Sequence, residues 1–350
     1  MTQKNILVYV GADCLGDAIQ KIPYINALRK GFPNYKLVWF ANMGSVFSGL
    51  LKDIGDELLD EVISQINFSA HLTDIFKNPF GGTPLEGRHF DYIFDTQKRW
   101  KQTLILKKIK HTHFVSGCAN FLLSDIKPKR GYKPARNVTQ RLIEMTSMIT
   151  HETYSIDYRV PLPQRFICEA HKLLPPGQRY IGFVPCGSAD EKKWPLQNYI
   201  QLAKVKQAEG FRPVFILGPD EQTYTHQILA ALPQAIIPGM MVVSDKDNVH
   251  GPLYYMALGQ QLTAIVANDC GPGHLLNCAN RPMIFLFGPT DAEKFAPARE
   301  GIQVLKATNW GSEVLSAIPF EAVKQAVDYV TAVSTSDAVT VDTMQLLNSP

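Results

Sequence analysis

The strongest constraint on the fold is a regular alternation of short apolar runs with amphipathic stretches. The runs NILVYV (5–10) and KLVWFA (36–41) have the length and residue types of strands, and DAIQKIPYINALRKGF (17–32) between them has helical spacing. The same pattern continues with strand-like runs at 90–97, 179–185, 212–218, 262–269 and 281–288. A strand–helix–strand rhythm is typical of parallel sheets covered by helices, so we expect an α/β, doubly wound fold.

The length of the chain predicts more than one domain. With 350 residues it exceeds one ordinary core. The alternation weakens over 120–160 and restarts at RYIGFVP (179–185). We therefore expect two Rossmann-like domains, 1–160 and 161–335, and a weakly periodic tail at 336–350. Ligands of such sheets bind at the carboxyl ends of the strands, so we expect the site in a cleft between the domains.

Composition excludes several classes of protein. A net charge of +3 argues against a dedicated nucleic-acid binder. No apolar run approaches the roughly 18 residues of a membrane span, and the N-terminus lacks the pattern of a signal peptide. The six cysteines form no C-x-x-C pair, which disfavours a zinc or redox motif. We expect a cytoplasmic protein with reduced thiols and no metal site.

The first loop that contains candidate functional residues is GADCLGDAIQKIP (11–23). Asp17 lies where a strand gives way to a helix. An aspartate there is more often an N-cap that accepts a hydrogen bond from the first helical N–H groups. It can also act as a general base that the helix N-terminus keeps ionised. Both interpretations remain open on the residues alone.

The second loop, PCGSADEKKWP (185–195), contains donors for an anion. Gly187 and Ser188 offer backbone and hydroxyl donors, and Lys192 precedes a helix that starts at a proline. Such a set suits a diphosphate. The alternative is a solvated loop of mixed charge.

Two further strands end in loops with polar residues. Glu221 in ILGPDEQTY (216–224) can bind ribose hydroxyls, as an acid does in dinucleotide-binding folds, or can be a first-turn acid that complements a helix dipole. Thr290, in FGPTD (287–291), follows the strand-like run at 281–288 and is expected to line the same site.

The fourth loop is IVANDCGPGH (265–274). Asp269 ends an apolar run, and Gly271 and Gly273 begin a predicted helix whose N-terminus favours anions. The glycines would let a ligand approach closely, and the acid suits sugar hydroxyls better than phosphate. His274 can donate a ring N–H to a phosphate, or can be a core histidine bonded to the backbone.

Together these stretches resemble glycosyltransferase family 9, the bacterial ADP-heptose:lipopolysaccharide heptosyltransferases. The resemblance covers about residues 5–330. It is carried by LGDAIQKIPYINALRKGFP (15–33), FDYIFDTQ (90–97), DEKKWPLQNYIQLA (190–203), ILGPDE (216–221), NDCGPGHL (268–275) and RPMIFLFGPTD (281–291).

The resemblance implies the GT-B fold, in which an N-terminal domain binds the acceptor and a C-terminal domain binds the sugar nucleotide. It implies an inverting displacement without a metal. Asp17 would be the base, and Lys192 with Ser188 would hold the leaving diphosphate. The donor site would comprise Gly187, Ser188, Lys192, Glu221, Asp269, Gly271, Gly273, His274 and Thr290.

The resemblance also implies partners. The co-substrate would be a nucleotide sugar, ADP-heptose, with no other cofactor. The acceptor would be a lipid-linked or other glycan at the inner membrane face, approached through the basic stretch KPKRGYKPAR (127–136). Gly16, Lys98 and Arg99 are candidate acceptor contacts, although Lys98 and Arg99 also suit a solvated helix start.

Some positions depart from the family pattern. VGADCLGD and KRWKQT (98–103) differ from it in the acceptor domain, which leaves the acceptor open. The long segment 238–251 leaves the nucleotide base open. Donors with UDP or GDP, a sugar-nucleotide epimerase or hydrolase, and a non-catalytic binder are the alternatives. Cys14, Cys186 and Cys270 replace other small residues in these loops, and a simple replacement is the favoured interpretation.

Overall fold

The computed structural model describes residues 3–68, 79–239 and 251–332. The chain divides into two compact units, Met1–Pro161 and Leu162–Pro350, here called the N-terminal and C-terminal units. Each contains a five-stranded sheet in which all paired strands are parallel. This confirms the predicted α/β class with doubly wound parallel sheets.

The sheet of the N-terminal unit has the order β3-β2-β1-β4-β5. Its strands are β1 (Lys4–Tyr9), β2 (Tyr35–Ala41), β3 (Glu61–Ser64), β4 (His89–Asp95) and β5 (Lys110–Ser116). β5 was not among the predicted strands. The strand KHTHFVS is half polar and lies at the sheet edge, so it lacks a long apolar run.

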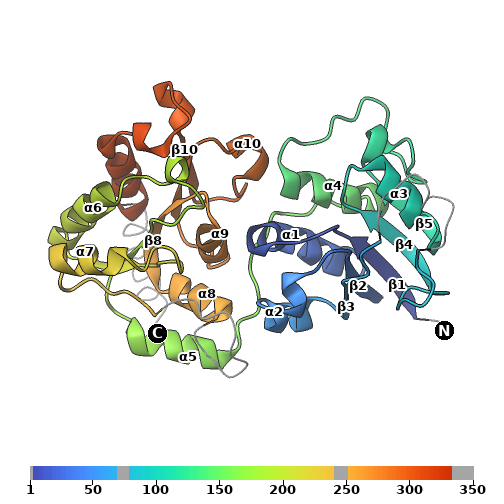
Figure 1. Ribbon diagram of the computed structural model, residues 1–350, viewed down its shortest axis with the longest axis horizontal. Helices are drawn as coiled ribbons and strands as arrows, with labels where there is room; N and C mark the ends of the chain where they lie inside the picture. The colour runs from blue at the N-terminus through green and yellow to red at the C-terminus, as the bar shows by residue number, and fades with distance from the viewer. Residues whose placement is uncertain (1–2, 69–78, 240–250, 333–350) are drawn as a thin grey trace, which may run out of the picture. The chain divides into compact units, whose positions relative to one another are not determined.

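Helices cover both faces of this sheet. They are α1 (Leu15–Gly31), α2 (Lys52–Leu58), α3 (Trp100–Leu106) and α4 (Val138–Thr150), with short 3-10 turns η1 (Val46–Ser48) and η3 (Cys118–Phe121). Right-handed crossovers place α1 and α2 on one face and α3 on the other, and α4 packs on α1 (Figure 1).

The core of the N-terminal unit is rich in aromatic side chains. Tyr24 of α1 meets Phe94 of β4 edge to face, with ring centroids 6.1 Å apart. On the other face Phe40 packs against Phe68 and Phe80. The buried residues of β1 and β2 explain why these strands read as largely continuous apolar runs in the sequence.

The sheet of the C-terminal unit has the order β10-β9-β8-β6-β7. Its strands are β6 (Tyr180–Val184), β7 (Arg212–Phe215), β8 (Leu262–Asn268), β9 (Met283–Phe287) and β10 (Ile302–Lys306). β10 was not among the strands predicted from the sequence either. It is an edge strand whose five residues are all half-buried, so its pattern is weak.

The C-terminal unit has helices on both faces as well (Figure 1). They are α5 (Gln164–Leu173), α6 (Leu196–Ala208), α7 (Tyr224–Ala231), α8 (Pro252–Gln260), α9 (Gly271–Asn277) and α10 (Ala292–Phe295), with 3-10 turns η4 (Asp190–Lys192), η5 (Ala307–Trp310) and η6 (Leu315–Ala317). α5 packs on α8 and α8 packs on α9. A helix that begins at Phe320 joins α6 in a separate apolar cluster.

The strand orders define where ligands are expected. In each sheet the chain leaves the first strand in one direction and later returns to its other side. These switch points lie between β1 and β4 and between β6 and β8. In open α/β sheets, ligands bind at the carboxyl ends of the strands at such points. Asp17 lies in the first turn of α1, which follows β1, and Lys192 lies in the loop that follows β6. Both residues are therefore at switch points.

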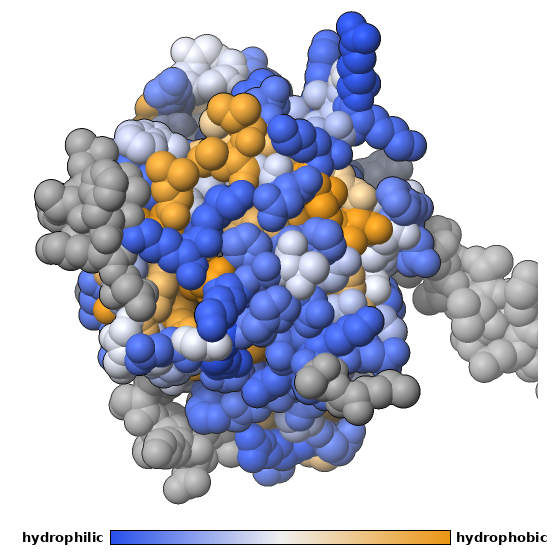
Figure 2. Space-filling model, turned by 90° about the vertical axis from the view of Figure 1, so that its right-hand side faces the viewer, coloured by the Kyte–Doolittle hydropathy of each residue, from blue (hydrophilic) through white to orange (hydrophobic). Residues whose placement is uncertain are grey.

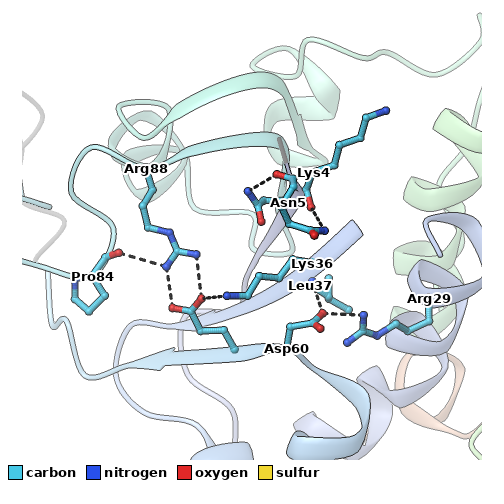
Figure 3. A network of polar contacts seen from close by, with 10 residues as sticks. Lys4, Asn5, Arg29, Lys36, Leu37, Asp60, Pro84 and Arg88 are labelled. Carbon is cyan, nitrogen blue, oxygen red and sulfur yellow. Dashed lines mark hydrogen bonds and ion pairs between the residues drawn. The ribbon is translucent and has the colours of Figure 1, made fainter. Parts of the chain in front are cut away.

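At the amino ends of its strands, the N-terminal sheet has a network of ion pairs (Figure 3). Glu61 at the start of β3 contacts Lys36 of β2 and Arg88, both at 2.8–3.0 Å. Asp60 contacts Arg29 of α1 at 2.8 Å. This network lies at the amino ends of the strands, away from the switch point. It therefore supports the fold rather than the candidate site.

The surface is mostly hydrophilic on the face drawn in Figure 2, where apolar side chains gather in several patches between polar ones. Within the described part of the chain, no helix has both the length and the apolar character needed to cross a bilayer.

Candidate functional site

Asp17 lies in the first turn of α1 and is exposed. The N-cap position belongs to Cys14, whose side chain makes no capping bond. The N-cap interpretation of Asp17 is therefore wrong. Its carboxylate instead stands three residues into the helix, where the unpaired N–H groups favour negative charge. Gly16 precedes it in the same turn and is half-buried.

The sequence analysis overlooked two buried residues, one four positions before Asp17 and one four positions after it. Asp13 is 5% exposed, and its Oδ2 accepts hydrogen bonds from Trp39 Nε1 at 3.0 Å and Ser45 Oγ at 3.1 Å. Lys21 is 7% exposed and donates from Nζ to the backbone carbonyl of Asp17 at 3.0 Å. Burial raises the pKa of Asp13 and lowers that of Lys21. The sequence signal for Lys21 was its place among the apolar residues of a predicted helix, which is buried from Ala18 to Ile25.

The loop after β4 holds Lys98 and Arg99, both exposed, with Arg99 at the N-cap position of α3. Lys98 lines a small recess with Gln97 and Arg141 of α4. Asp95 at the end of β4 lines it too. This placement is compatible with both interpretations of the two basic residues.

Asp95 is a further buried acid that the sequence analysis did not single out. Thr103 Oγ1 and Ser116 Oγ donate to its Oδ2 at 2.6 and 2.8 Å, and the Gln97 N–H donates to Oδ1 at 3.0 Å. Burial raises the pKa of Asp95 to about 6. Its position at a strand end was visible in FDTQ, but its burial was not.

In the C-terminal unit, Asn268 joins the loops that follow β6 and β8. Its Oδ1 accepts from Tyr199 Oη at 2.8 Å and from the Trp194 N–H at 3.3 Å. Its Nδ2 donates to the carbonyl of Cys186 at 3.0 Å. The fully buried side chain thus fixes the second loop against the fourth. The Asn-Asp pair at a strand end was noted in the sequence, but the role of the asparagine was missed.

Glu221 is buried at 3% exposure and is held by the second loop. Its Oε1 accepts from Lys193 Nζ at 3.0 Å and from the Gly187 N–H at 3.3 Å. Partial burial by itself lowers the pKa of Lys193, but the contact with Glu221 outweighs it and raises that pKa. α7 begins only at Tyr224 with no acid in its first turn. The interpretation of Glu221 as a first-turn helix acid is therefore wrong.

Lys192 ends the turn η4, is half-buried, and its side chain makes no hydrogen bond or ion pair within the described residues. Ser188 is exposed in the same loop. Among the described residues, Lys193 is therefore paired with Glu221, while the ammonium of Lys192 has no hydrogen-bond or ion-pair partner. The N–H of Gly187 is already bonded to Glu221, so this donor is occupied in the structure.

Asp269 and His274 contact each other at the fourth loop. His274 Nε2 lies 3.1 Å from Asp269 Oδ1, and His274 Nδ1 is buried without a partner within the described residues. The ring is 4% exposed and lies against Phe285. The bond to the Asp269 side chain replaces the backbone bond expected for a core histidine.

The two glycines of the fourth loop differ. Gly271 is the first residue of α9 and half-buried. Gly273 is buried, and a Cβ there would lie 2.9 Å from the carbonyl of Asn268. Gly273 therefore allows α9 to pack on β8. Thr290 is half-buried just before α10.

The three cysteines of these loops have different exposures. Cys14 is exposed, Cys270 is half-buried, and Cys186 is buried. The Cys186 thiol accepts from the Gly218 N–H at 3.2 Å. Its hydrogen bond with the Cys270 thiol and its burial raise its pKa. Within the described residues, no three His, Cys, Asp or Glu side chains are grouped as metal ligands.

Two expected features fall outside the described residues. Most of the segment 238–251, where the base of the nucleotide was expected, lies at 240–250. The tail 336–350 is outside as well.

Comparison with models of protein families places this chain in a known family. The model of glycosyltransferase family 9 (heptosyltransferase) matches residues 82–317, more than half of the chain. The matched stretch includes all candidate donor-site residues. It begins after Asp17, so the role of Asp17 still depends on its local motif.

Among curated proteins, the chain is similar to lipooligosaccharide heptosyltransferase 2 of Haemophilus influenzae. The two are 27% identical over 127 residues, which is 36% of each chain. The chain thus matches about a third of the length of this relative.

Among solved structures, the chain resembles a family 9 glycosyltransferase from Veillonella parvula, with a TM-score of 0.70 and 18% identity over 94% of this chain and 97% of that one. It also resembles the ADP-heptose lipopolysaccharide heptosyltransferase II of E. coli, with a TM-score of 0.68 and 17% identity over 95% and 99%. These likenesses concern the fold and, with the two parallel sheets, confirm the GT-B class. On the strength of the family match, the chain belongs to glycosyltransferase family 9, the heptosyltransferase family.

Proposed function

We propose that this protein transfers heptose from ADP-heptose to a lipopolysaccharide-type or other cell-envelope glycan, with inversion at the anomeric carbon and without a metal. The observation that carries the proposal is the free ammonium of Lys192. It stands beside a second lysine that is neutralised by Glu221, in a loop at the switch point of the C-terminal sheet. Membership of the family supports the reaction class, and the named donor of the E. coli structure supports ADP-heptose.

The leaving group determines what the C-terminal unit must supply. When the bond from the anomeric carbon to the phosphate oxygen breaks, its electron pair remains on the nucleoside diphosphate. In this proposal Lys192 and the exposed hydroxyl of Ser188 stabilise that charge, as fixed donors do in the absence of a metal. The N–H groups at the start of α9, beginning with Gly271, add to this field.

The remaining donor contacts involve acids and polar side chains. Asp269, fixed by His274, would accept hydrogen bonds from sugar hydroxyls. Glu221 would accept hydrogen bonds from the ribose hydroxyls. For this, its carboxylate would have to exchange part of its contact with Lys193 for a hydroxyl. Thr290 would line the same subsite.

The N-terminal unit supplies the base in this proposal. Asp17 accepts the proton of the acceptor hydroxyl while the oxygen of that hydroxyl forms the new bond to the anomeric carbon. The reaction requires that both units reach the same pair of substrates, and exclusion of water would prevent hydrolysis of the donor.

The acceptor side is the least defined part of the proposal. The recess lined by Lys98 and Arg141 suits an acidic group on the acceptor. The stretch 127–136 exposes Lys127, Lys129, Arg130, Lys133 and Arg136. We place the protein in the cytoplasm, in weak contact with anionic lipid at the inner membrane face through this stretch. Sedimentation with phosphatidylglycerol vesicles, but not with phosphatidylcholine vesicles, would support that contact.

The first experiment is a comparison of thermal stabilisation by ADP, UDP, GDP and CDP. A ligand at 100 times its dissociation constant adds about 2.7 kcal/mol to the free energy of unfolding. We expect this shift with ADP alone. A shift with UDP or GDP would replace the donor, and no shift with any nucleotide would reject the donor site.

The second experiment tests the reaction. ADP-heptose is incubated with a heptose-deficient lipooligosaccharide, and the anomeric configuration of the product is read by NMR. Turnover of ADP-heptose without any acceptor would favour an epimerase or hydrolase instead. Asp17→Asn should abolish transfer while keeping the ADP-induced shift, and full transfer by that variant would reject Asp17 as the base.

A further inference from the structure

Charge is unevenly distributed along the chain. Residues 96–136 contain eleven lysines and arginines but a single acid, Asp125. The rest of the chain has 24 basic and 31 acidic residues, so the net charge of +3 conceals a strongly basic part of an otherwise acidic protein. Asp125 pairs with Lys107 at 3.0 Å and offsets only that cation. Most of the basic residues lie in two short stretches, 98–101 and 122–136, here called the first and second basic segments.

The fold of the N-terminal unit brings the two basic segments together. Lys98 of the first segment and Pro134 of the second line the same recess, and Phe121 of η3 lines it as well. The rings of Phe121 and Tyr132 meet edge to face, with centroids 5.8 Å apart. Tyr132 Oη also donates a hydrogen bond to Glu144 of α4. The second segment is therefore held on packed elements beside the first, and their positive charges act on one surface.

Each basic segment also carries a large apolar side chain in contact with solvent. Trp100 begins α3 and is 49% exposed, and Leu122 directly follows η3 and is 70% exposed. α3 and η3 contact each other. Trp39 and Trp194, in contrast, are fully buried. Exposed apolar residues beside lysines and arginines are typical of surfaces that meet a membrane, where tryptophan lies at the level of the headgroups.

We propose that the two basic segments form a docking surface for anionic phospholipid, in which Trp100 and Leu122 enter the boundary between headgroups and acyl chains. The inference rests on the proposed function for the nature of the partner, because a lipid-linked acceptor lies in such a membrane. A cluster of about four to eight cations recognises anionic lipid, and apolar side chains provide a second attachment. Because Lys98 belongs to both, docking brings the recess of the N-terminal unit to the lipid surface.

A nucleic acid is the competing anionic partner. Proteins that bind single strands stack the bases on aromatic side chains, and Trp100 alone would provide one such platform. Leu122 is aliphatic and more exposed than Trp100, so it suits acyl chains and offers no stacking surface to a base. Lipid therefore accounts for both exposed side chains, whereas nucleic acid accounts for one.

The first test measures insertion with the full chain and vesicles of phosphatidylglycerol whose acyl chains carry bromine. Bromine quenches the fluorescence of a tryptophan that reaches the acyl boundary. Trp100→Phe should lose the quenching seen in wild type. Trp310→Phe is the matched control, because Trp310 is 38% exposed in the C-terminal unit, and this variant should keep the quenching. Wild type that is not quenched, or quenching that persists in Trp100→Phe, would overturn the proposal.

The second test measures the contribution of charge by sedimentation with phosphatidylglycerol vesicles. The test variant replaces three exposed cations of the second basic segment, Lys127→Gln, Lys129→Gln and Arg130→Gln. The control variant replaces three exposed lysines of the C-terminal unit, Lys172→Gln, Lys204→Gln and Lys294→Gln. Each cation near an anionic surface changes the binding constant about fivefold, so the test variant should bind at least about tenfold more weakly. The control variant should bind like wild type, and an equal loss in both variants would contradict a defined surface.

Both tests are independent of heptose transfer, and unchanged melting temperatures show that the variants are folded. Loss of vesicle binding with an intact ADP-induced thermal shift would reject the docking surface and leave the donor site. The reverse result would reject the donor site and leave the docking surface. Binding of a labelled single-stranded RNA, lost in the test variant, without any binding to phosphatidylglycerol vesicles would assign the surface to nucleic acid and overturn the proposal.

Discussion

At the scale of single residues, two adjacent lysines have separate surroundings. Lys193 pairs with a carboxylate that is 5% exposed, whereas the Lys192 side chain has no hydrogen bond or ion pair within the described residues. Because breaking a buried pair strands the remaining charge, the two lysines should respond differently to the same substitution.

We predict that Lys193→Met lowers the free energy of unfolding by about 2 kcal/mol. Breaking a fully buried pair costs about 3–5 kcal/mol, and the 19% exposure of Lys193 reduces this. Lys192→Met should stay within about 0.5 kcal/mol of wild type but weaken ADP binding about tenfold or more. Urea unfolding and calorimetric titration measure the two effects. The assignment is wrong if Lys192→Met is the less stable variant.

Asp95 makes stability depend on pH. Burial raises its pKa from 3.8 to about 6. Because the folded pKa lies above the unfolded one, the stabilising contribution is complete below about pH 4 and is lost as the pH rises through 6. The free energy of unfolding of wild type relative to Asp95→Asn should therefore fall by about 3 kcal/mol between pH 4 and 7.

Glu61 offers a control of opposite sign for this measurement. The hydrogen bond from Arg88 lowers the pKa of Glu61 against its partial burial. Its contribution is therefore present above the unfolded pKa and is lost as the pH falls. Chemical unfolding of Asp95→Asn between pH 4 and 7, and of Glu61→Gln below pH 4.5, should give opposite slopes relative to wild type. A flat profile for Asp95→Asn would contradict the raised pKa.

At the scale of elements, the start of α9 depends on a missing Cβ. A Cβ on Gly273 would lie 2.9 Å from the carbonyl of Asn268 and 3.2 Å from Phe285 Cζ. We predict that Gly273→Ala lowers the free energy of unfolding by about 1–3 kcal/mol, because α9 must move away from β8. Gly239→Ala, where a Cβ meets nothing within 4 Å, should be nearly neutral. Equal stability of the two variants in urea would contradict this packing.

At the scale of the whole molecule, the two units have separate sheets and cores. If the C-terminal unit holds the nucleotide, ADP should slow hydrogen exchange in the loops 185–193, 218–223 and 269–274. Helix α4 of the other unit should exchange at an unchanged rate. Mass spectrometry of exchanged peptides measures this. Protection only at the loop after β1 would place the nucleotide in the N-terminal unit.

Much of the architecture was predictable from the sequence, because buried parallel strands read as uninterrupted apolar runs. β1, β2, β6, β8 and β9 follow that rule. The edge strands β5 and β10 do not, because one or both of their faces retain contact with solvent and their residues are mixed. Edge position is set by the order of strands in the sheet, which a single run of residues does not reveal.

The sequence by itself determined the α/β class, the two parallel sheets and the loops in which polar residues follow strands, because apolar periodicity and turn residues are local properties. Only the tertiary structure decided which polar groups are free. It pairs Lys193 rather than Lys192 with Glu221, pairs His274 with Asp269, and buries both Asp13 and Lys21. These pairings join residues from different elements, and their energies depend on burial, which arises only when the sheets and helices pack together.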